Sequence, residues 1–240
     1  MTKASPRFKR IMLKLSGEAL AGEAGSGIDG NILNAMASDI SEIIKSGVQV
    51  ALVIGGGNFV RGVQISSSGG MNRAAGDAMG MLGTVMNCLA MQDALDKVGC
   101  PSTVMSAVKM EPVCEYFDRR KALKLLNDSQ VVLFGAGTGN PFFTTDTAAA
   151  LRAIETECDV IIKATKVDGV YSADPKKDPT AVKFDYISCD EVLQKKLGVM
   201  DLTAITLCQD HQMPILVFKM EAGNLQTAVY NNKIGTFVSP

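Results

Sequence analysis

The sequence alternates short β-rich apolar runs with longer amphipathic segments along most of its length. This alternation predicts that helices cover both faces of a mostly parallel sheet. The fold class is therefore α/β, as a three-layer αβα sandwich. We expect strands at residues 11–15, 48–54, 103–106, 131–134, 160–164 and 215–218.

The amphipathic segments predict helices at residues 32–45, 72–98, 118–126, 146–155, 190–197 and 202–210. Asp118 and Asp146 are plausible N-caps of two of them. Residues 72–98 are rich in Ala, Met and Gly and poor in charge, so we expect this helix to be buried on several sides and to lie at a subunit interface. The Pro- and Lys-rich stretch 174–183 must be an excursion, and we expect 1–240 to be one domain.

Composition narrows the functional classes. The chain has 240 residues, 47% of them hydrophobic, which is enough for a large core. Its net charge is −1 with Lys and Arg spread along it, so neither nucleic acid nor an anionic membrane is an expected partner. The six cysteines form no C-x-x-C and predict buried thiols in a reducing cytoplasm, and no apolar run is long enough to be a signal sequence or to span a membrane. We therefore expect a cytoplasmic protein, with its single histidine, His211, on the surface.

Four glycine-rich or polar loops follow the expected strands, at the position where open α/β sheets bind ligands. The first contains Lys14, Leu15, Ser16 and Gly17. A lysine beside Ser-Gly offers a fixed positive charge and N–H donors to a transferring phosphoryl group. The alternative is a solvated lysine before an ordinary turn.

The second loop is Gly55-Gly-Gly-Asn58, followed by Arg61. Three glycines let the backbone approach an anion closely and adopt positive φ, which forms an N–H nest, and Arg61 adds a bidentate donor. The alternative is a flexible turn, but three glycines would be costly there.

The third loop runs from Gly135 through Thr145. Asn140 and Pro141 replace the end of a dinucleotide fingerprint, and the chain has no Walker motif, so neither a Rossmann site nor a P-loop is expected. Phe142 and Phe143 either enclose a base or are two core aromatics at a helix entry. Asp146 then caps the helix, orients a catalytic lysine, or does both.

The fourth loop, residues 163–175, combines lysine, acidic, hydroxyl and aromatic side chains that suit a nucleotide with its magnesium. The alternative is a decorated hairpin that turns at Asp168-Gly169.

Together with Met71-Asn-Arg73 and Asp77, these loops closely resemble the bacterial uridylate kinase family, in order from about residue 9 to 236. The pair T-G-N-P-F-F-T-T-D and K-A-T-K-V-D-G-V-Y-x-A-D-P is the specific part of the resemblance. It implies an amino-acid-kinase fold with a largely parallel eight-stranded sheet. It also implies transfer of the γ-phosphoryl group of MgATP to UMP, giving UDP for pyrimidine nucleotide biosynthesis.

The resemblance also implies the site residues. The UMP side, mainly before about residue 150, would contain Gly56, Asp77, Thr138, Gly139, Asn140, Pro141, Phe142, Phe143, Thr144 and Thr145. The ATP side, mainly C-terminal, would contain Lys14, Leu15, Ser16, Gly17, Gly57, Arg61, Thr165, Tyr171 and Asp174. The catalytic residues would be Lys14, Arg61, Asp146, Lys163 and Asp201. Mg²⁺ would be held through the ATP phosphates rather than by a protein-only cage, and nothing resembles a transition-metal site.

Members of this family are typically hexamers built from dimers, activated by GTP and inhibited by UTP. In residues 91–103, where a guanine nucleotide effector would need cations, the one basic residue is Lys97. The sequence therefore argues against strong GTP activation, although Arg119 and Arg120 can contribute from elsewhere. UTP inhibition needs less, because UTP can compete at the UMP site.

Two rival functions remain. A carboxylate or carbamate kinase of the same superfamily is disfavoured by the N-P-F-F-T-T-D run. A non-catalytic nucleotide-binding or storage protein is disfavoured because Lys14, Arg61, Asp146 and Asp174 are all present.

Overall fold

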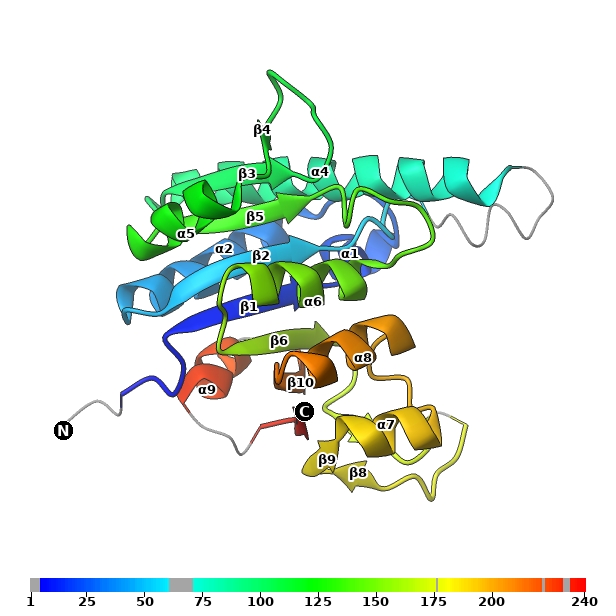
Figure 1. Cartoon of the computed structure of the whole chain (residues 1–240). Coiled ribbons are helices and arrows are strands. Elements are labelled where there is room, and N and C mark those ends of the chain that lie inside the picture. The colour runs from blue at the N-terminus through cyan, green and yellow to red at the C-terminus, as the bar shows by residue number, and fades with distance from the viewer. Residues whose placement is uncertain (1–4, 61–70, 176, 222, 231–233) are drawn as a thin grey trace.

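The structure is a computed structural model that describes residues 5–60, 71–175, 177–221, 223–230 and 234–240. Its centre is a sheet whose strands follow the order β4-β3-β5-β2-β1-β6-β10-β11-β9 (Figure 1). The strands of this sheet are β1 (Arg10–Leu15), β2 (Gln49–Ile54), β3 (Ser102–Ser106), β4 (Glu115–Tyr116), β5 (Val131–Gly135), β6 (Val160–Thr165), β9 (Tyr186–Ser188), β10 (Ile215–Lys219) and β11 (Thr236–Ser239). Neighbouring strands are parallel, except for the antiparallel pair of β10 and β11.

The α/β class and the predicted parallel strands are confirmed, but the expected count of eight strands is wrong because the sheet has nine. The strands that the apolar pattern did not indicate are short and lie at the two ends of the sheet. For example, β4 has two residues, and Glu115 pairs with Met105 of β3. Such a strand exists because its neighbour offers hydrogen-bonding groups, so no apolar run announces it in the sequence.

The described helices are α1 (Gly17–Leu20), the 3₁₀ helix η1 (Gly22–Ala24), α2 (Gly30–Lys45), α4 (Arg73–Lys97), α5 (Arg119–Asn127), α6 (Thr145–Glu155), α7 (Cys189–Lys195), α8 (Leu202–Asp210) and α9 (Asn224–Tyr230). The predicted helices are all present, and Asp118 caps α5 as expected. The prediction that Asp146 caps α6 is wrong. Thr144 is the N-cap and accepts hydrogen bonds from the backbone N–H groups of Asp146 and Thr147. The Asp146 side chain therefore does not cap α6 and can bind other partners.

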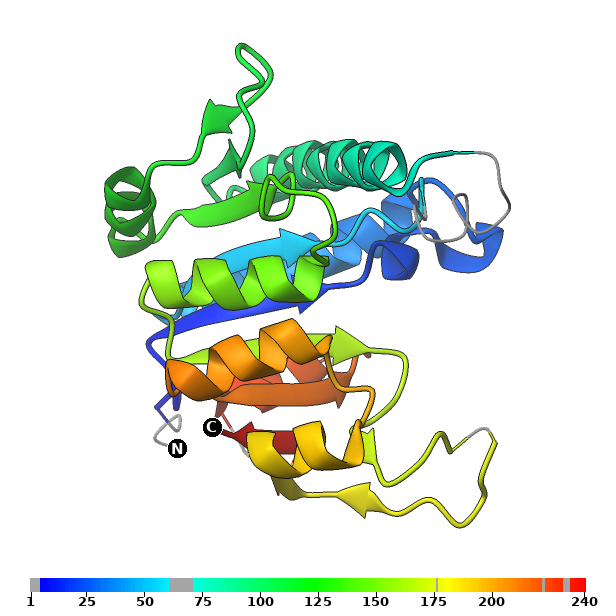
Figure 2. The ribbon, with the colours of Figure 1, turned by 45° about the vertical axis from the view of Figure 1, so that its right-hand side comes forward.

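Two layers of helices enclose the sheet (Figure 2). Alternate residues of β1 point to opposite faces: Ile11, Leu13 and Leu15 pack with α2, α4 and α9, whereas Met12 packs on the side of α6 and α8. Burial of both faces requires strands that are apolar throughout, which is why the parallel strands were visible in the sequence.

The long helix α4 leaves one side uncovered in the single chain. Met79, Leu82 and Met86 are 37%, 52% and 50% exposed, and their spacing places them along one stripe of the helix. The expectation that this segment is buried on several sides is met only on its other faces.

Smaller expectations can be checked as well. Five cysteines are buried and Cys114 is half-buried, and all six thiols are free. His211 is exposed at the end of α8. None of the described helices is long and apolar enough to cross a membrane.

Candidate active site

The carboxyl ends of β1, β2, β5 and β6 lie at one edge of the sheet because these strands are parallel. The four predicted loops therefore converge at this edge, on the right of the sheet in Figure 1. Lys14 near the end of β1 lies directly opposite Lys163 of β6 in the strand register.

Asp146, in the first turn of α6, joins these two lysines. Its Oδ1 lies 2.6 Å from the Nζ of Lys14, and its Oδ2 lies 2.7 Å from the Nζ of Lys163. Lys163 also donates to the backbone carbonyl of Val199 at 2.6 Å. The carboxylate thus fixes two ammonium groups at the centre of the site, as the orienting role predicted for Asp146 requires.

Burial and charge act in opposite directions on this group. Burial alone would raise the pKa of Asp146, but the ammonium groups of Lys14 and Lys163 together outweigh it and hold that pKa below its usual range. Burial lowers the pKa of Lys163, and the attraction of Asp146 opposes that effect. The three groups carry a net charge of +1 when all are ionised, which favours an anion beside them.

Asp201 lies next to this group but binds other partners. Its carboxylate accepts hydrogen bonds from the hydroxyls of Thr144 (2.5 Å) and Thr147 (3.0 Å) and from the backbone N–H of Ala204 (3.0 Å). It therefore caps α8 and ties it to the start of α6. Through Thr144 it supports the turn that presents Asp146.

The loops after β1 and β2 interlock too tightly for side chains. A Cβ on Gly17 would lie 2.3 Å from the carbonyl oxygen of Gly55, and a Cβ on Gly56 would lie 2.4 Å from the carbonyl oxygen of Gly80 on α4. Gly55 and Gly56 do not take positive φ, so the predicted left-handed nest is not what requires glycine at these two positions. Close approach of neighbouring backbones is the reason.

Left-handed backbone occurs instead in the loop after β5. Ala136, Gly137 and Gly139 have φ of 61°, 59° and 80°, and Phe142 has φ of 72°. The backbone N–H of Phe142 donates to Oδ2 of Asp77 at 2.8 Å. Asp77 therefore holds this loop to the start of α4.

Arg73 is one helical turn before Asp77 and fixes its carboxylate. The Nε of Arg73 lies 2.9 Å from both carboxylate oxygens of Asp77. Phe142 and Phe143 are 66% and 49% exposed, so the interpretation of two core aromatics is wrong. They are available to a ligand.

A cavity of about 590 Å³ lies between these loops and α4. It brings together most of the residues predicted for the UMP side, namely Gly56, Asp77, Thr138, Asn140, Phe143, Thr144 and Thr145, as well as Gly57. Gly139, Pro141 and Phe142 do not line it. Arg73, which belongs to the Met71-Asn-Arg73 part of the resemblance but was given no site role, also lines it. Gly80 and Thr84 line it too, and the sequence did not single them out. The spacing of Arg73 and Asp77, four apart on a helix, was the available signal that Arg73 belongs to the site.

Lys163 lines a second cavity, of about 650 Å³. It contains Thr165, Tyr171 and Asp174 as predicted, together with Lys195 and Lys196, which were not predicted. The hydroxyl of Tyr171 donates to Asp168 at 2.6 Å. Leu15 and Arg61 were also predicted for the ATP side. The Leu15 side chain is buried in the core, so only its backbone can face a ligand. Arg61 lies outside the described residues.

The hairpin interpretation of the fourth loop needs a correction. β7 (Val170–Tyr171) pairs with β8 (Lys183–Phe184), so the connection spans residues 172–182 and does not turn at Asp168-Gly169. The excursion predicted at 174–183 is this connection, and it carries Asp174 to the second cavity.

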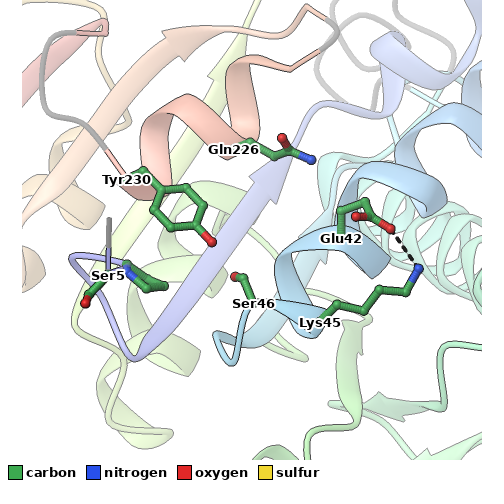
Figure 3. A pocket seen from close by; sticks show the side chains of 7 residues that line it. Ser5, Glu42, Lys45, Ser46, Gln226 and Tyr230 are labelled. Carbon is green, nitrogen blue, oxygen red and sulfur yellow. Dashed lines mark hydrogen bonds and ion pairs between the residues drawn. The ribbon is translucent and has the colours of Figure 1, made fainter. Parts of the chain in front are cut away.

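A third cavity, of about 660 Å³, lies at the opposite edge of the sheet (Figure 3). It is lined by Ser5, Pro6, Glu42, Lys45, Ser46, Gln226 and Tyr230, and none of these is a predicted site residue. Lys45, its cation, is 2.7 Å from Glu42. This cavity is remote from the loops that follow the strands.

The described residues contain no group of three or more His, Cys, Asp or Glu that could hold a metal ion. Both oxygens of Asp146 are engaged by lysines. A magnesium ion at this centre would therefore depend on phosphate oxygens and water for its ligands.

Comparison with known proteins places this site in a family. The amino acid kinase family matches residues 9–219. The chain is 58% identical over 234 residues to a uridylate kinase of Pseudomonas putida, which covers 97% of this chain and 94% of that protein. It is 56% identical over 239 residues to a uridylate kinase of Stutzerimonas stutzeri, covering 99% of this chain and 96% of that protein.

Two solved structures are similar over nearly the whole chain. A UMP kinase from Bacillus anthracis has a TM-score of 0.92 at 34% identity and covers 97% of this chain and 96% of its own. A UMP kinase from Ureaplasma parvum has a TM-score of 0.90 at 37% identity and covers 98% and 100%. The chain therefore belongs to the amino acid kinase family. Within that family it is a member of the uridylate kinases, a group of enzymes.

Proposed function

We propose that this enzyme transfers the γ-phosphoryl group of MgATP to the 5′-phosphate of UMP and releases UDP and ADP. The observation that carries the proposal is that Asp146 holds Lys14 and Lys163 at the carboxyl edge of the sheet. Its neighbour Thr145 lines the first cavity, and Lys163 lines the second. Two phosphate-bearing ligands, one in each cavity, would meet at these lysines. The names of the relatives at 56–58% identity support UMP as the acceptor.

The reaction needs positioning and cations more than proton transfer. An oxygen of the UMP phosphate attacks the γ-phosphorus, the bond from that phosphorus to the β,γ-bridging oxygen breaks, and the electron pair leaves with ADP. The attacking phosphate is already anionic, so no general base is required. Lys163 uses two of its three N–H donors on Asp146 and Val199, which leaves one for a phosphoryl oxygen.

Each remaining residue has a proposed part. Lys14 and Arg61 stabilise charge on the transferred group, and Asp146 orients Lys14 and Lys163. Asp201 acts through the Thr144 turn. Magnesium bound with ATP would supply positive charge to the phosphates.

The two nucleotides would occupy different parts of one domain. UMP would lie in the cavity of Asp77 and Thr138–Thr145, with Asp77 accepting from a ribose hydroxyl and the base near Phe142 to Thr145. ATP would lie in the cavity of Thr165, Tyr171 and Asp174, with Tyr171 beside the adenine. The first cavity is lined by residues up to 145 and the second by residues from 163 onward, which supports this division.

The wider setting follows from the same resemblance. We propose a cytoplasmic homohexamer that acts in pyrimidine nucleotide biosynthesis, with UTP as an inhibitor that competes at the UMP site. Strong activation by GTP is not expected, because residues 91–103 contain one basic side chain. The similarity to uridylate kinases at 56–58% identity argues against the two rival functions, a carboxylate or carbamate kinase and a storage protein.

The test is ADP release measured with MgATP and, separately, UMP, CMP, dTMP, aspartate and carbamate, each repeated with GTP. ADP release with UMP supports the proposal. Turnover of aspartate or carbamate in its place would indicate the carboxylate or carbamate kinase. Tight nucleotide binding without turnover of any acceptor would indicate the storage protein.

A further inference from the structure

Asn58 in the glycine loop and Asn87 in the middle of α4 form hydrogen bonds to each other in both directions. Neither residue has a part in the proposed chemistry. The Nδ2 of Asn58 donates to Oδ1 of Asn87 at 2.9 Å, and the Nδ2 of Asn87 donates to Oδ1 of Asn58 at 2.8 Å. Asn58 is 3% exposed and Asn87 is fully buried. We call these two side chains the amide clasp.

The second N–H of each amide reaches the backbone. Asn87 donates to the carbonyl of Gly55 at 2.7 Å, and Asn58 donates to the carbonyl of Gly27 at 2.8 Å. The four N–H groups of the clasp are therefore all used, so each amide has one orientation that satisfies it. A fully satisfied buried network of this kind rigidifies what it joins.

The amide clasp lies where the loops after β1 and β2 and helix α4 approach one another closely. A Cβ on Gly17 would lie 2.5 Å from the Asn58 Oδ1, and a Cβ on Gly83 of α4 would lie 3.2 Å from the Gly56 carbonyl oxygen. The loop after β1, the loop after β2 and helix α4 thus meet around Asn58. Asn58 therefore lies against the backbone at Gly17, three residues after Lys14.

Helix α4 also holds the loop after β5, one turn earlier. The hydroxyl of Thr84 accepts the backbone N–H of Ala136 at 2.7 Å and donates to the carbonyl of Met81 at 2.6 Å. Thr84 and Asn87 are three residues apart and so lie on one face of the helix. One rigid helix therefore sets the distance between the two loops that line the first cavity.

We propose that Asn87 is a positioning residue for phosphoryl transfer. Through the amide clasp it fixes the Gly55 carbonyl and thereby aims the N–H groups of the glycine loop at the phosphates. This inference rests on the proposed function. UMP would still be held by Asp77 and the loop after β5, so loss of the clasp disturbs the alignment of the reacting groups more than it disturbs the binding of UMP.

The test uses Asn87→Leu, which keeps the size of the side chain and removes its hydrogen bonds. We expect kcat to fall by about tenfold to a hundredfold, since small misplacements of reacting groups have effects of this order, while KM for UMP changes by less than about threefold. If this variant does not fold, Asn58→Ala breaks the same pair from the loop side and carries the same expectation. In the double variant the fall in kcat should not exceed that of the worse single variant by more than about twofold, because both changes break one interaction.

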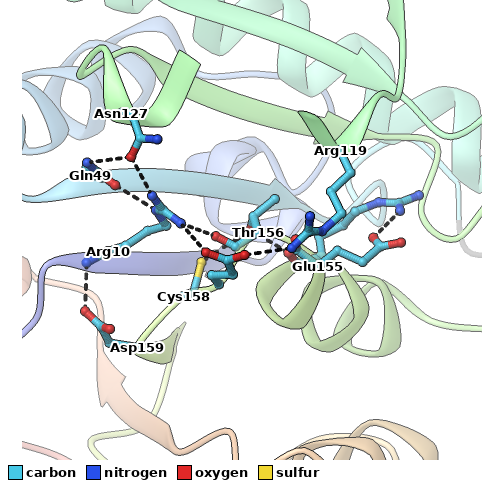
Figure 4. A network of polar contacts seen from close by, with 10 residues as sticks. Arg10, Gln49, Arg119, Asn127, Glu155, Thr156, Cys158 and Asp159 are labelled. Atoms are coloured by element: carbon cyan, nitrogen blue, oxygen red, sulfur yellow. Dashed lines mark hydrogen bonds and ion pairs between the residues drawn. The ribbon is translucent and has the colours of Figure 1, made fainter. Parts of the chain in front are cut away.

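The matched control is Gln49→Met (Figure 4). Gln49 is the first residue of β2, the strand whose other end leads into the glycine loop. Gln49 is 9% exposed, and its Oε1 accepts from the Nε of the buried Arg10 at 2.7 Å. Arg10 also donates to the carbonyl of Thr156 at 2.6 Å and to Oδ1 of Asn127 at 2.9 Å. Gln49→Met disrupts a buried network of similar kind, so its melting temperature should fall while kcat stays within about twofold of wild type.

The outcomes separate the two proposals. Wild-type turnover of UMP, with kcat reduced in the clasp variants and not in the control, supports the inference. A folded Asn87→Leu or Asn58→Ala whose kcat is unchanged, or no lower than that of Gln49→Met, overturns it and leaves the proposed function intact. Absence of UMP turnover in the wild type overturns both.

Discussion

Lys14 and Lys163 lie opposite each other on adjacent parallel strands, and the two oxygens of Asp146 hold one ammonium group each. Without the carboxylate, two like charges would face each other in a site shielded from water, where repulsion is strong. With it, both cations are fixed before any substrate arrives. Preorganised charge of this kind is what the transfer of a phosphoryl group needs.

The first prediction concerns the neutral variant Asp146→Asn. An amide oxygen can accept from one lysine, but it cannot offset the charge of both, so the two ammonium groups should move apart. We expect kcat for ADP release to fall by about 10²-fold or more, as when one preorganised group is removed from other active sites. Circular dichroism should show a folded protein. Asp118→Asn, which keeps an N-cap on α5, is the control and should retain wild-type kcat; wild-type turnover in Asp146→Asn would contradict the assignment.

The second prediction concerns acid stability. The pKa of Asp146 in the folded protein lies below its ordinary value of 3.8. The stabilisation from its ion pairs is therefore complete above that ordinary value, and it is lost as the pH falls through the lower pKa of the folded state. Urea unfolding of wild type and Asp146→Asn between about pH 7 and pH 2 should give a difference in unfolding free energy that shrinks toward the acid end. A difference that stays constant would show that folding does not shift the pKa of Asp146.

Much of the fold could be predicted because each parallel strand is buried on both faces and so is an apolar run. The strands that were missed follow a different rule. Tyr186–Ser188 forms β9 because it pairs with residues 237–239 of β11, and this long-range pairing leaves no local pattern.

The site residues, too, could be predicted from the sequence only in part. Lys14, Asp146 and Lys163 lie in distinctive loops at strand ends, and Thr144 rather than Asp146 became the cap because a threonine two residues earlier was available. Asn87 could not be assigned from the sequence, since a single amide in an Ala- and Met-rich helix has no partner until the fold brings Asn58 beside it. Lys195 and Lys196 line a cavity together with residues 172–175 of the connection between β7 and β8. Their place in the site therefore depends on a contact between segments that are separate in the sequence.

The third prediction concerns the fit of Gly17. A methyl group there would meet the carbonyl oxygen of Gly55 at 2.3 Å, and backbone cannot yield as a flexible side chain can. We expect Gly17→Ala to lower the free energy of unfolding by about 1–3 kcal/mol and to reduce kcat, because the two loops must separate. Thermal unfolding and ADP release measure the two effects.

The control for Gly17→Ala is Gly30→Ala at the start of α2, where a Cβ meets nothing within 4 Å. This variant should be as stable as wild type or more stable by up to about 1 kcal/mol, since alanine restricts the unfolded chain. Wild-type stability and kcat in Gly17→Ala would show that the loops do not pack as described.

The fourth prediction concerns Arg61, which follows the glycine loop in sequence. If it stabilises charge on the transferred phosphoryl group, Arg61→Ala should lose most of the turnover and still fold. Arg61→Lys keeps the charge without the bidentate geometry, so it should recover only part of kcat. Steady-state kinetics of both variants decides this, and wild-type kcat in a folded Arg61→Ala would remove Arg61 from the mechanism.

The fifth prediction concerns the uncovered stripe of α4. Met79, Leu82 and Met86 form an exposed apolar surface on a helix, which is typical of an interface between proteins. If a second copy of the chain covers it, Leu82→Glu places a charge in that contact and should shift the protein to a smaller species in light scattering. Val182→Glu, at a side chain 65% exposed on another part of the surface, should leave the mass unchanged. A wild-type protein that is already monomeric, or a Leu82→Glu variant with the wild-type oligomeric mass, would show that this stripe does not join subunits.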